Sequence, residues 1–112
     1  MNKEIQQKNL TATGIKLFIT KNGKEVARAS IFLIKNDLHP EPYALLEDVY
    51  VDEDQRGTGL GKQIVNAAIA EAKKQGCKKM IGTSRYSRPK VHQFYINLGF
   101  QDYGKEFKIE FE

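Results

Sequence analysis

The sequence predicts an α/β (α+β) fold: one mixed, mainly antiparallel central sheet flanked by helices, in the order ββ-β-α-β-α-ββ. Two segments with the two-residue period of strands flank Asn22-Gly23, a pair that favours a tight hairpin turn. Two later segments, 59–75 and 91–98, have the spacing of amphipathic helices. Helices that interrupt a series of strands in this way pack on a single sheet.

The first three strands are expected at residues 15–20, 26–34 and 43–51. The third segment is dense in apolar residues, which predicts a central strand. It nevertheless carries Glu47 and Asp48 in its middle. Charged side chains inside a central strand are costly unless they face a cleft, so this strand is expected to border a site.

The remaining elements have local start and stop signals. Gly76 suits the position after the first helix, and residues 79–84 are expected to form a short strand. Ser87 is expected to cap the second helix, which has Pro89 in its first turn. Two final strands are expected at 100–103 and 107–111, the second because its apolar and charged residues alternate.

The length of 112 residues predicts a single domain, 1–112, in which residues 1–13 are a frayed tail or a short edge strand. No apolar run approaches the roughly 20 residues of a membrane span, and the first ten residues lack the apolar core of a secretory signal. The single Cys77 excludes an internal disulfide framework, and with only two His the sequence predicts no metal site. A cytoplasmic protein is expected.

Charge is unevenly distributed, although the formal net charge is only +4. Residues 72–101 contain seven basic residues and no acidic one, whereas residues 41–54 contain six acidic residues and no Lys or Arg. This pattern favours an anionic ligand on one side and a cationic one on the other. Nucleic acid is not the expected partner, because an aromatic stacking platform and a basic helix face are missing.

The most informative segment is 49–62, a strand followed by a glycine-rich turn and the start of a helix. Glycines there expose successive N–H groups, and the helix N-terminus adds a positive dipole end, so the segment suits phosphate. A Walker A loop is excluded, because Arg56 stands at its first Gly and Gln63 follows Lys62. The dinucleotide fingerprint is also excluded, because the glycines at 57, 59 and 61 have the wrong spacing and no leading βαβ unit is present.

A third pattern, Arg/Gln-x-x-Gly-x-Gly/Ala, matches Arg56-Gly57-Thr58-Gly59-Leu60-Gly61 in full. With it, the chain resembles the GNAT superfamily of N-acetyltransferases. Residues 92–100 (HQFYINLGF) resemble the family's Phe-Tyr-x-x-Leu-Gly-Phe helix, and residues 46–51 (LEDVYV) resemble its central strand. The chain departs from the family in lacking the two helices that usually follow the first strand, and in having Arg88 where Asn is common before the Phe-Tyr pair.

The resemblance implies acetyl-CoA as donor and direct attack by an amine of a small molecule or a protein in a ternary complex. It places Glu47 as the base that receives the amine proton and Tyr95 as the acid that protonates the departing thiolate. Backbone groups of the strand would hold the pantetheine arm, and the Val49 N–H would stabilise the oxyanion. The residues expected to bind the cofactor are Val49, Tyr50, Val51, Arg56, Gly57, Thr58, Gly59, Leu60, Gly61, Lys62 and Arg88.

Several alternatives stay open. Asp48 and His92 are rival candidates for the base, and Tyr95 lies on the apolar side of its helix, where it could be core. Asp48 is expected on the opposite face of the strand from Glu47 unless a bulge intervenes. The alternative function is a non-catalytic CoA-binding or regulatory module of the same fold. An exposed final hairpin would be open to pairing with a second copy, which makes a homodimer one option.

Overall fold

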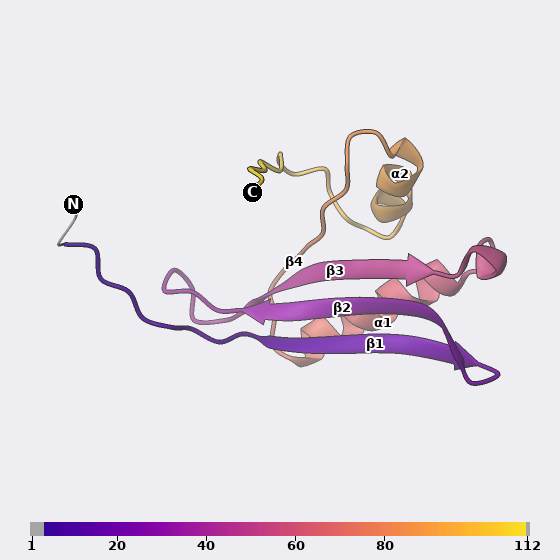
Figure 1. The fold of residues 1–112 in the computed structure, drawn as a ribbon, viewed down its shortest axis with the longest axis horizontal. Helices are drawn as coiled ribbons and strands as arrows, with labels where there is room; N and C mark the ends of the chain where they lie inside the picture. Colours follow the sequence, from indigo (N-terminus) through magenta and orange to yellow (C-terminus); the bar gives the residue numbers. More distant parts are fainter. Residues whose placement is uncertain (1–3, 112) are drawn as a thin grey trace.

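A computed structural model describes residues 4–111 of the chain as a four-stranded sheet with two α-helices (Figure 1). The strand order is β1-β2-β3-β4, antiparallel except for the parallel pair β3 and β4. The mixed, mainly antiparallel fold is therefore confirmed. The elements are β1 (Thr13–Lys21), β2 (Lys24–Ile34), β3 (Tyr43–Val51), the 3-10 turn η1 (Glu53–Gln55), α1 (Leu60–Lys74), β4 (Met80–Ile81) and α2 (Pro89–Asn97).

The hairpin between β1 and β2 forms as its turn residues predict. Asn22 and Gly23 both have positive φ angles, 53° and 78°. Two successive left-handed residues make the type I′ turn, whose twist matches that of paired strands. The resulting register sets Ile15 opposite Ile31 and Ile19 opposite Ala27.

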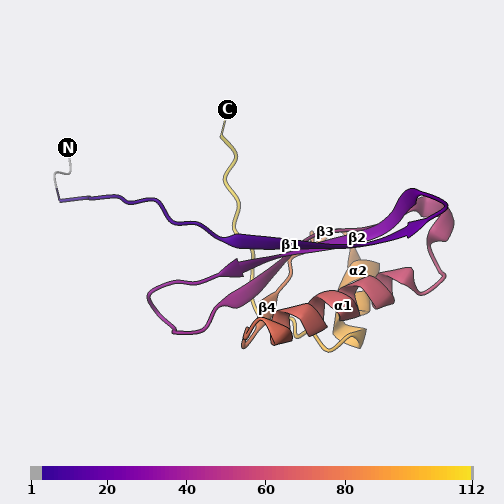
Figure 2. The same cartoon turned by 90° about the horizontal axis from the view of Figure 1, so that it is seen from below.

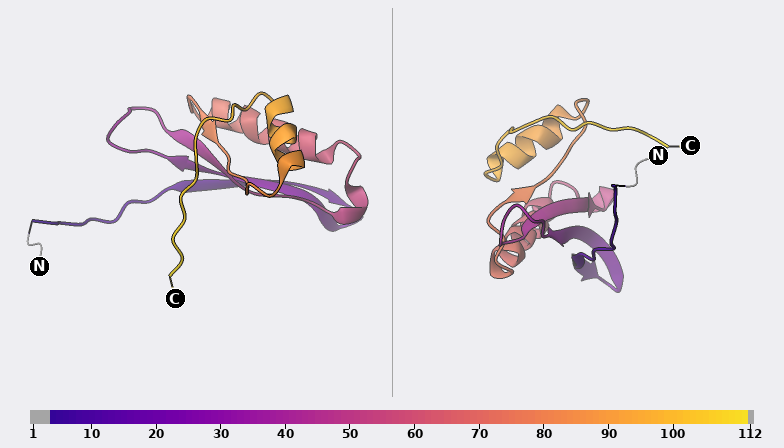
Figure 3. Two further views of the ribbon diagram at one scale, coloured as in Figure 1. Left: turned by 90° about the horizontal axis from the view of Figure 1, so that it is seen from above. Right: turned by 90° about the vertical axis from the view of Figure 1, so that its left-hand side faces the viewer.

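The hydrophobic core lies between the sheet and α1, which runs along one face of the sheet (Figure 2). Apolar residues at every second position of a strand meet the apolar side of the helix, which is the standard way to bury both. The buried residues of this core are Ala29, Ile31, Ala44, Leu46, Ile64, Val65, Ala68 and Ala72. Within residues 4–111 no helix covers the other face of the sheet, whereas α2 lies beyond the β3 edge (Figure 3).

The pairing of β3 with β4 is short, and this matters for the site. Only two residue pairs join the strands, Ala44 with Met80 and Leu45 with Ile81. After Ile81 the chain turns away from β3 and leads to α2 (Figure 1). Within the described part of the chain, residues 46–51 therefore have a strand partner on the β2 side but none on the β4 side.

Three expectations about the second half of the chain were wrong. The two final strands at 100–103 and 107–111 are absent, since no strand or helix follows Asn97 in the part described, up to residue 111. The short strand expected at 79–84 covers only Met80–Ile81. The N-cap of α2 is Arg88 and not Ser87, and no side chain caps this helix. A strand forms only where a neighbouring strand can pair with its backbone groups. The single chain offers no such neighbour to residues 100–103 and 107–111, and only a short one to residues 79–84.

Candidate active site

The glycine-rich turn ends in a helix N-terminus with free amide groups. Gly57 and Gly59 have φ angles of 82° and 89°, which only glycine adopts readily, and Gly59 is the N-cap of α1. The N–H of Gln63 makes the first intrahelical bond, to the Gly59 carbonyl at 3.0 Å. The amides of residues 60–62 thus have no partner within the helix and point out of its first turn. Such a group of amides binds anions, phosphate in particular.

Side chains of the turn fix it to the end of β3. The Nε of Arg56 donates a hydrogen bond to the Val51 carbonyl at 3.0 Å, and its guanidinium lies 5.8 Å from the Tyr50 ring centre. The Thr58 hydroxyl donates to the Gln55 carbonyl. Arg56 was expected only as a ligand of phosphate, but its Nε has a structural task. Its terminal amino groups remain for an anion, because a guanidinium carries five N–H donors.

A bulge in β3 lies between the two carboxylates of the strand. Arg28 pairs with Tyr50 and Ser30 with Glu47, so Asp48 and Val49 together oppose the single residue Ala29. Asp48 adopts a φ of 54°, the left-handed conformation typical of the first residue of such a bulge. Leu46 points to α1, so Glu47 points to the open face, and the bulge leaves Asp48 exposed there as well. Asp48 was expected on the opposite face from Glu47 unless a bulge intervened, and a bulge is present.

Asp48 is held by Arg28 of the neighbouring strand. Arg28 Nε donates to Asp48 Oδ2 at 2.8 Å and Nη2 to Oδ1 at 3.2 Å, and the guanidinium lies 4.7 Å from the Tyr50 ring centre. The hydrogen bond from Arg28 lowers the pKa of Asp48. A carboxylate with a lowered pKa and two charge-assisted hydrogen bonds is a poor proton acceptor. Asp48 is therefore poorly suited to be the base.

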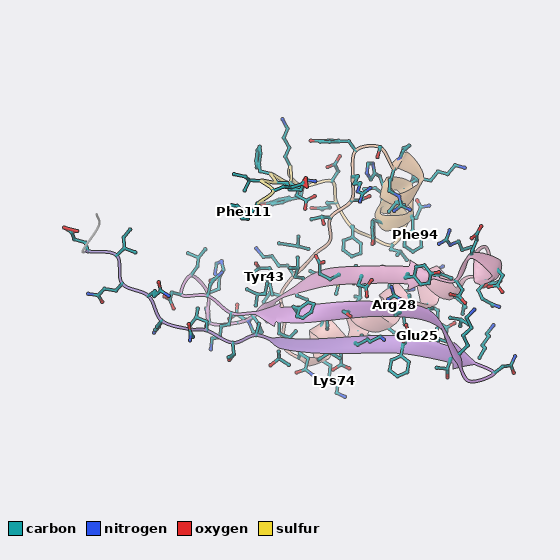
Figure 4. The ribbon with its side chains drawn as sticks, in the orientation of Figure 1. Glu25, Arg28, Tyr43, Lys74, Phe94 and Phe111 are labelled. Atoms are coloured by element: carbon teal, nitrogen blue, oxygen red, sulfur yellow. The ribbon has the colours of Figure 1, made fainter. Side chains whose placement is uncertain are left out.

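The network around Arg28 extends across the open face of the sheet. Arg28 Nη1 contacts Glu25 Oε2 at 3.4 Å (Figure 4). Lys16 Nζ lies 2.6 Å from Glu25 Oε1. Arg28 was missed in the sequence. A signal was present, since Arg28 is the one charged residue between Glu25 and Lys35.

Glu47 differs from Asp48 in being unpaired. Its side chain is exposed, and within residues 4–111 it makes no ion pair and no side-chain hydrogen bond. It lies two residues beyond Leu45, the last residue of β3 that pairs with β4. A carboxylate in this position can receive a proton from a group that approaches the unpaired edge of the strand.

Tyr95 lies on α2 in an aromatic cluster. Its ring meets Phe94 edge-to-face at 5.4 Å and Phe100 at 5.2 Å, and it packs against the main core. Burial raises the pKa of Tyr95, and the positive charge of Arg88 opposes that shift. The phenol therefore keeps its proton at neutral pH. Tyr95 is half-buried and packs against the edge of the main core.

His92, the third candidate base, is engaged with the backbone. Its Nε2 lies 2.6 Å from the Arg85 carbonyl. A carbonyl oxygen only accepts, so Nε2 carries the proton and the ring is fixed by the chain that leads into α2. This contact gives His92 a structural role in positioning the first turn of α2.

Packing brings the glycine-rich turn, the end of β3 and α2 together. A Cβ added at Gly61 would lie 3.5 Å from the Phe94 ring and 3.7 Å from Val51 Cγ2. The N-terminus of α1 is thus within contact distance of both neighbours. Glu47 lies on the open face of β3, whereas Tyr95 and Arg88 belong to α2 and its N-cap. Within residues 4–111 no hydrogen bond, ion pair or aromatic contact joins Glu47 to Tyr95. Among residues 4–111 no cluster of three or more metal-ligating side chains is present, and no helix is long and apolar enough to cross a bilayer.

Several known proteins with related sequences or structures are named acetyltransferases. The chain is 36% identical over 66 residues to a probable glucosamine 6-phosphate N-acetyltransferase of Oryza sativa, a match that covers 59% of this chain and 38% of that protein. The solved glucosamine-6-phosphate N-acetyltransferase of Arabidopsis thaliana superposes with a TM-score of 0.79 at 28% identity, over 88% of this chain and 67% of that one. An aminoglycoside N-acetyltransferase in complex with CoA shares the fold, with a TM-score of 0.73 at 18% identity, over 87% of this chain and 75% of that one.

The curated relative and the family model differ in how much of their length this chain covers. The chain spans only about two fifths of the length of the curated rice relative, so it matches one segment of that protein. In contrast, the model of the acetyltransferase (GNAT) family matches residues 2–100, which is most of the chain. The match includes the glycine-rich turn, β3 and α2, the elements that meet in the candidate site. The chain therefore belongs to the GNAT family of acetyltransferases.

Proposed function

We propose that this protein transfers an acetyl group from acetyl-CoA to an amine. The observation that carries the proposal is the glycine-rich turn at the N-terminus of α1. It lies next to an edge of β3 that, among residues 4–111, has no strand partner beyond Leu45. Phosphate groups suit the free amides of the turn, and an extended chain with amide groups suits an unpaired strand edge. Acetyl-CoA has both parts, a pyrophosphate and a pantetheine arm. The CoA-bound aminoglycoside N-acetyltransferase of the same fold supports this donor.

In this proposal the pyrophosphate binds the amides of residues 60–62 and the free amino groups of Arg56. Lys62 and Arg88 are exposed and add positive charge around it, which suits a polyanion. The pantetheine arm lies along residues 49–51. The Val51 carbonyl is already taken by Arg56, and the Asp52 N–H bonds to Val26 of β2. The backbone groups of Val49, which face away from β2, therefore carry most of this contact.

The chemical step needs a neutral amine, a polarised thioester and a proton for the thiolate. The acetyl thioester supplies the activated carbonyl. Glu47 takes the proton from the amine as its nitrogen bonds to the carbonyl carbon, and the Val49 N–H stabilises the oxygen of that carbonyl. The C–S bond then breaks, and the thiolate is left within reach of α2.

Tyr95 serves the departing thiolate chiefly as a hydrogen-bond donor. A thiol such as that of CoA has a pKa of about 8.5, below that of an ordinary phenol. Burial raises the pKa of Tyr95 further, so full proton transfer to the thiolate is uphill. A phenol that keeps its proton can still stabilise the negative sulfur by a charge-assisted hydrogen bond, and the proton then comes from solvent or from the amine.

The acceptor is proposed to be a cationic amine. Arg28 is neutralised by Asp48, whereas Glu47 remains unpaired among the described residues, so the open face beside the base attracts positive charge. An amino sugar, a polyamine and a protein lysine all meet this condition. The curated rice relative is named for glucosamine 6-phosphate, which makes that phosphorylated amino sugar the first compound to test.

The experiment is a calorimetric titration with acetyl-CoA and CoA, followed by a thiol-release assay with a panel of amines. Glucosamine with and without its phosphate belongs in the panel, because the pair measures what the phosphate contributes. Micromolar binding and amine-dependent thiol release support the proposal. Tight binding without turnover on any amine favours the second candidate, a CoA-binding module. This candidate is kept because, within residues 4–111, no helix covers the face of the sheet opposite α1.

A further inference from the structure

The ring of Tyr50 contacts both the open face of the sheet and the glycine-rich turn. Tyr50 is exposed near the end of β3, where Arg28 is its register partner on β2. Two guanidinium groups lie over its ring, that of Arg28 at 4.7 Å and that of Arg56 at 5.8 Å from the ring centre. Among residues 4–111 no other aromatic ring has two cationic groups over it. The face of an aromatic ring is negative, so the Tyr50 ring attracts both groups.

The two guanidinium groups differ in what else holds them. Arg28 forms two hydrogen bonds with Asp48 and an ion pair with Glu25. Arg56 makes no ion pair within residues 4–111, and apart from the ring it is held by one hydrogen bond, from its Nε to the backbone of β3. The position of Arg56 therefore depends on the ring more than that of Arg28 does, and no carboxylate offsets its positive charge.

The backbone after β3 folds back so that Arg56 reaches the ring. The Asp52 N–H donates to the Val26 carbonyl at 2.8 Å, and the Gln55 N–H donates to the Asp52 carbonyl at 2.9 Å, which closes η1. Arg56 follows this turn directly, and its side chain returns to the end of β3. The bond from Nε fixes the inner part of the guanidinium beside the ring, which leaves the terminal amino groups for a ligand.

We propose that Tyr50 is a positioning residue, whose ring holds the guanidinium of Arg56 in place for the pyrophosphate of acetyl-CoA. This inference rests on the proposed binding of CoA at the glycine-rich turn. A long exposed side chain such as that of Arg56 loses conformational freedom when it binds an anion, and this loss opposes binding. A ring that already orders the guanidinium in the free protein removes part of that loss. Tyr50 acts through Arg56 and not by contact with the reacting atoms.

An aromatic ring suits this task better than a carboxylate. A carboxylate beside Arg56 would also position it, but it would occupy the N–H donors and cancel the charge, as Asp48 does for Arg28. The ring attracts the guanidinium through its face and uses none of the five N–H donors. Arg56 therefore keeps both its charge and its terminal donors for a phosphate.

The test compares two variants at position 50 by calorimetric titration with CoA. Tyr50→Ile removes the ring but keeps a side chain that favours strands, whereas the control Tyr50→Phe keeps the ring. Tyr50→Ile is expected to weaken CoA binding by about three- to tenfold, because a cation–π contact and part of the ordering of Arg56 are lost. Tyr50→Phe is expected to bind within about twofold of the unaltered protein. Equal affinities of Tyr50→Ile and the unaltered protein overturn the proposal.

The variant Arg56→Met separates positioning of the guanidinium from a general effect on β3. If Tyr50 acts through Arg56, the ring has nothing to position once the guanidinium is gone. The double variant is then expected to bind CoA within about twofold of Arg56→Met alone. A further loss in the double variant, as large as that of Tyr50→Ile by itself, overturns the proposal, because the ring then acts on the strand or on the ligand directly.

Nuclear magnetic resonance of the free protein tests the contact without CoA. An aromatic ring shifts the signals of protons over its face upfield. The side-chain protons of Arg56 are expected to show this shift in the unaltered protein and in Tyr50→Phe, and to lose it in Tyr50→Ile; no shift in the unaltered protein overturns the inference. A protein that shows the shift but does not bind CoA overturns the proposed function and this inference together, whereas Tyr50→Ile with unaltered CoA affinity overturns this inference alone.

Discussion

The role of the glycine-rich turn can be tested with a pair of glycines that share a backbone conformation but not a location. Gly59, the N-cap of α1, has a φ of 89°, and Gly76, just after its C-terminus, has a φ of 87°. A Cβ added at either position meets no atom within 4 Å. Gly59→Ala and Gly76→Ala therefore impose the same kind of strain, without any clash, at opposite ends of one helix.

The size of both effects can be worked out from the conformation. A non-glycine residue in the left-handed region costs roughly 1–2 kcal/mol, so each variant is expected to lose about that much stability. Alanine also favours a φ near +57°, which would rotate the first turn of α1 by about 30° at position 59. That rotation misaligns at least one amide–phosphate bond, and such bonds contribute about 1.5–3 kcal/mol. Gly59→Ala should thus weaken CoA binding by about 10- to 150-fold, whereas Gly76→Ala should not.

Two measurements decide the question: denaturant unfolding for stability, and calorimetric titration with CoA under conditions where both variants are folded. Equal losses of stability with a loss of affinity at position 59 alone would support the assignment. If Gly59→Ala binds CoA as the unaltered protein does, the turn does not hold the pyrophosphate. If Gly76→Ala weakens binding equally, the effect is one of helix stability, and the reasoning from local amides fails.

Three further predictions concern side chains of the site. Glu47→Gln should lower turnover by about a hundredfold or more at neutral pH, as removal of a general base does, with CoA affinity unchanged in the titration; an unchanged pH–rate profile would exclude Glu47 as the base. Tyr95→Phe should lower the rate by about tenfold while CoA affinity changes less, because only a hydrogen bond to the thiolate is lost; equal rates would return Tyr95 to a purely structural role. Asp48→Asn should keep the bulge, since Asn tolerates a positive φ, and should reduce stability at pH 7. Arg28 lowers the pKa of Asp48 in the folded state, so this contribution is present above the unfolded value of about 3.8 and is lost as the pH falls through the folded one. Unfolding curves of the two proteins should therefore converge in acid, and a constant difference would show that Asp48 acts through the backbone.

The first half of the fold follows from local signals in the sequence. The Asn22-Gly23 turn and the alternation of the flanking strands predict the hairpin, and the apolar run at 43–51 predicts β3 to the residue. These elements pair with their neighbours along the chain, so local preference and tertiary pairing agree. α1 is predicted within one residue at each end, because glycines flank it at 59 and 76.

The segment after α2 could not be predicted in this way. Alternating residues at 107–111 have the pattern of a strand, yet a strand forms only where an edge is offered to it. The alternation of residues shows that a segment prefers to be a strand, but it does not show which other strand the segment can pair with. The same limit applies to the two residues of β4, where the sequence suggests six.

The different roles of Glu47 and Asp48 also depend on the pairing of β2 with β3, which cannot be read from the sequence. Adjacent residues of a regular strand point to opposite faces, and one of two neighbouring acids would then be buried against α1. The bulge at Asp48 and Val49 avoids that cost by exposing both carboxylates on the open face. Arg28, one strand away, then pairs with Asp48 and leaves Glu47 without a partner among residues 4–111. An unpaired carboxylate can exchange a proton, whereas a carboxylate held by arginine stays charged.

If this division of roles holds, removing Arg28 should free Asp48 to act as a second proton acceptor. Arg28→Met should then restore part of the activity that Glu47→Gln loses. A double variant no more active than Glu47→Gln alone would show that the position of the carboxylate, and not its pairing, selects the base.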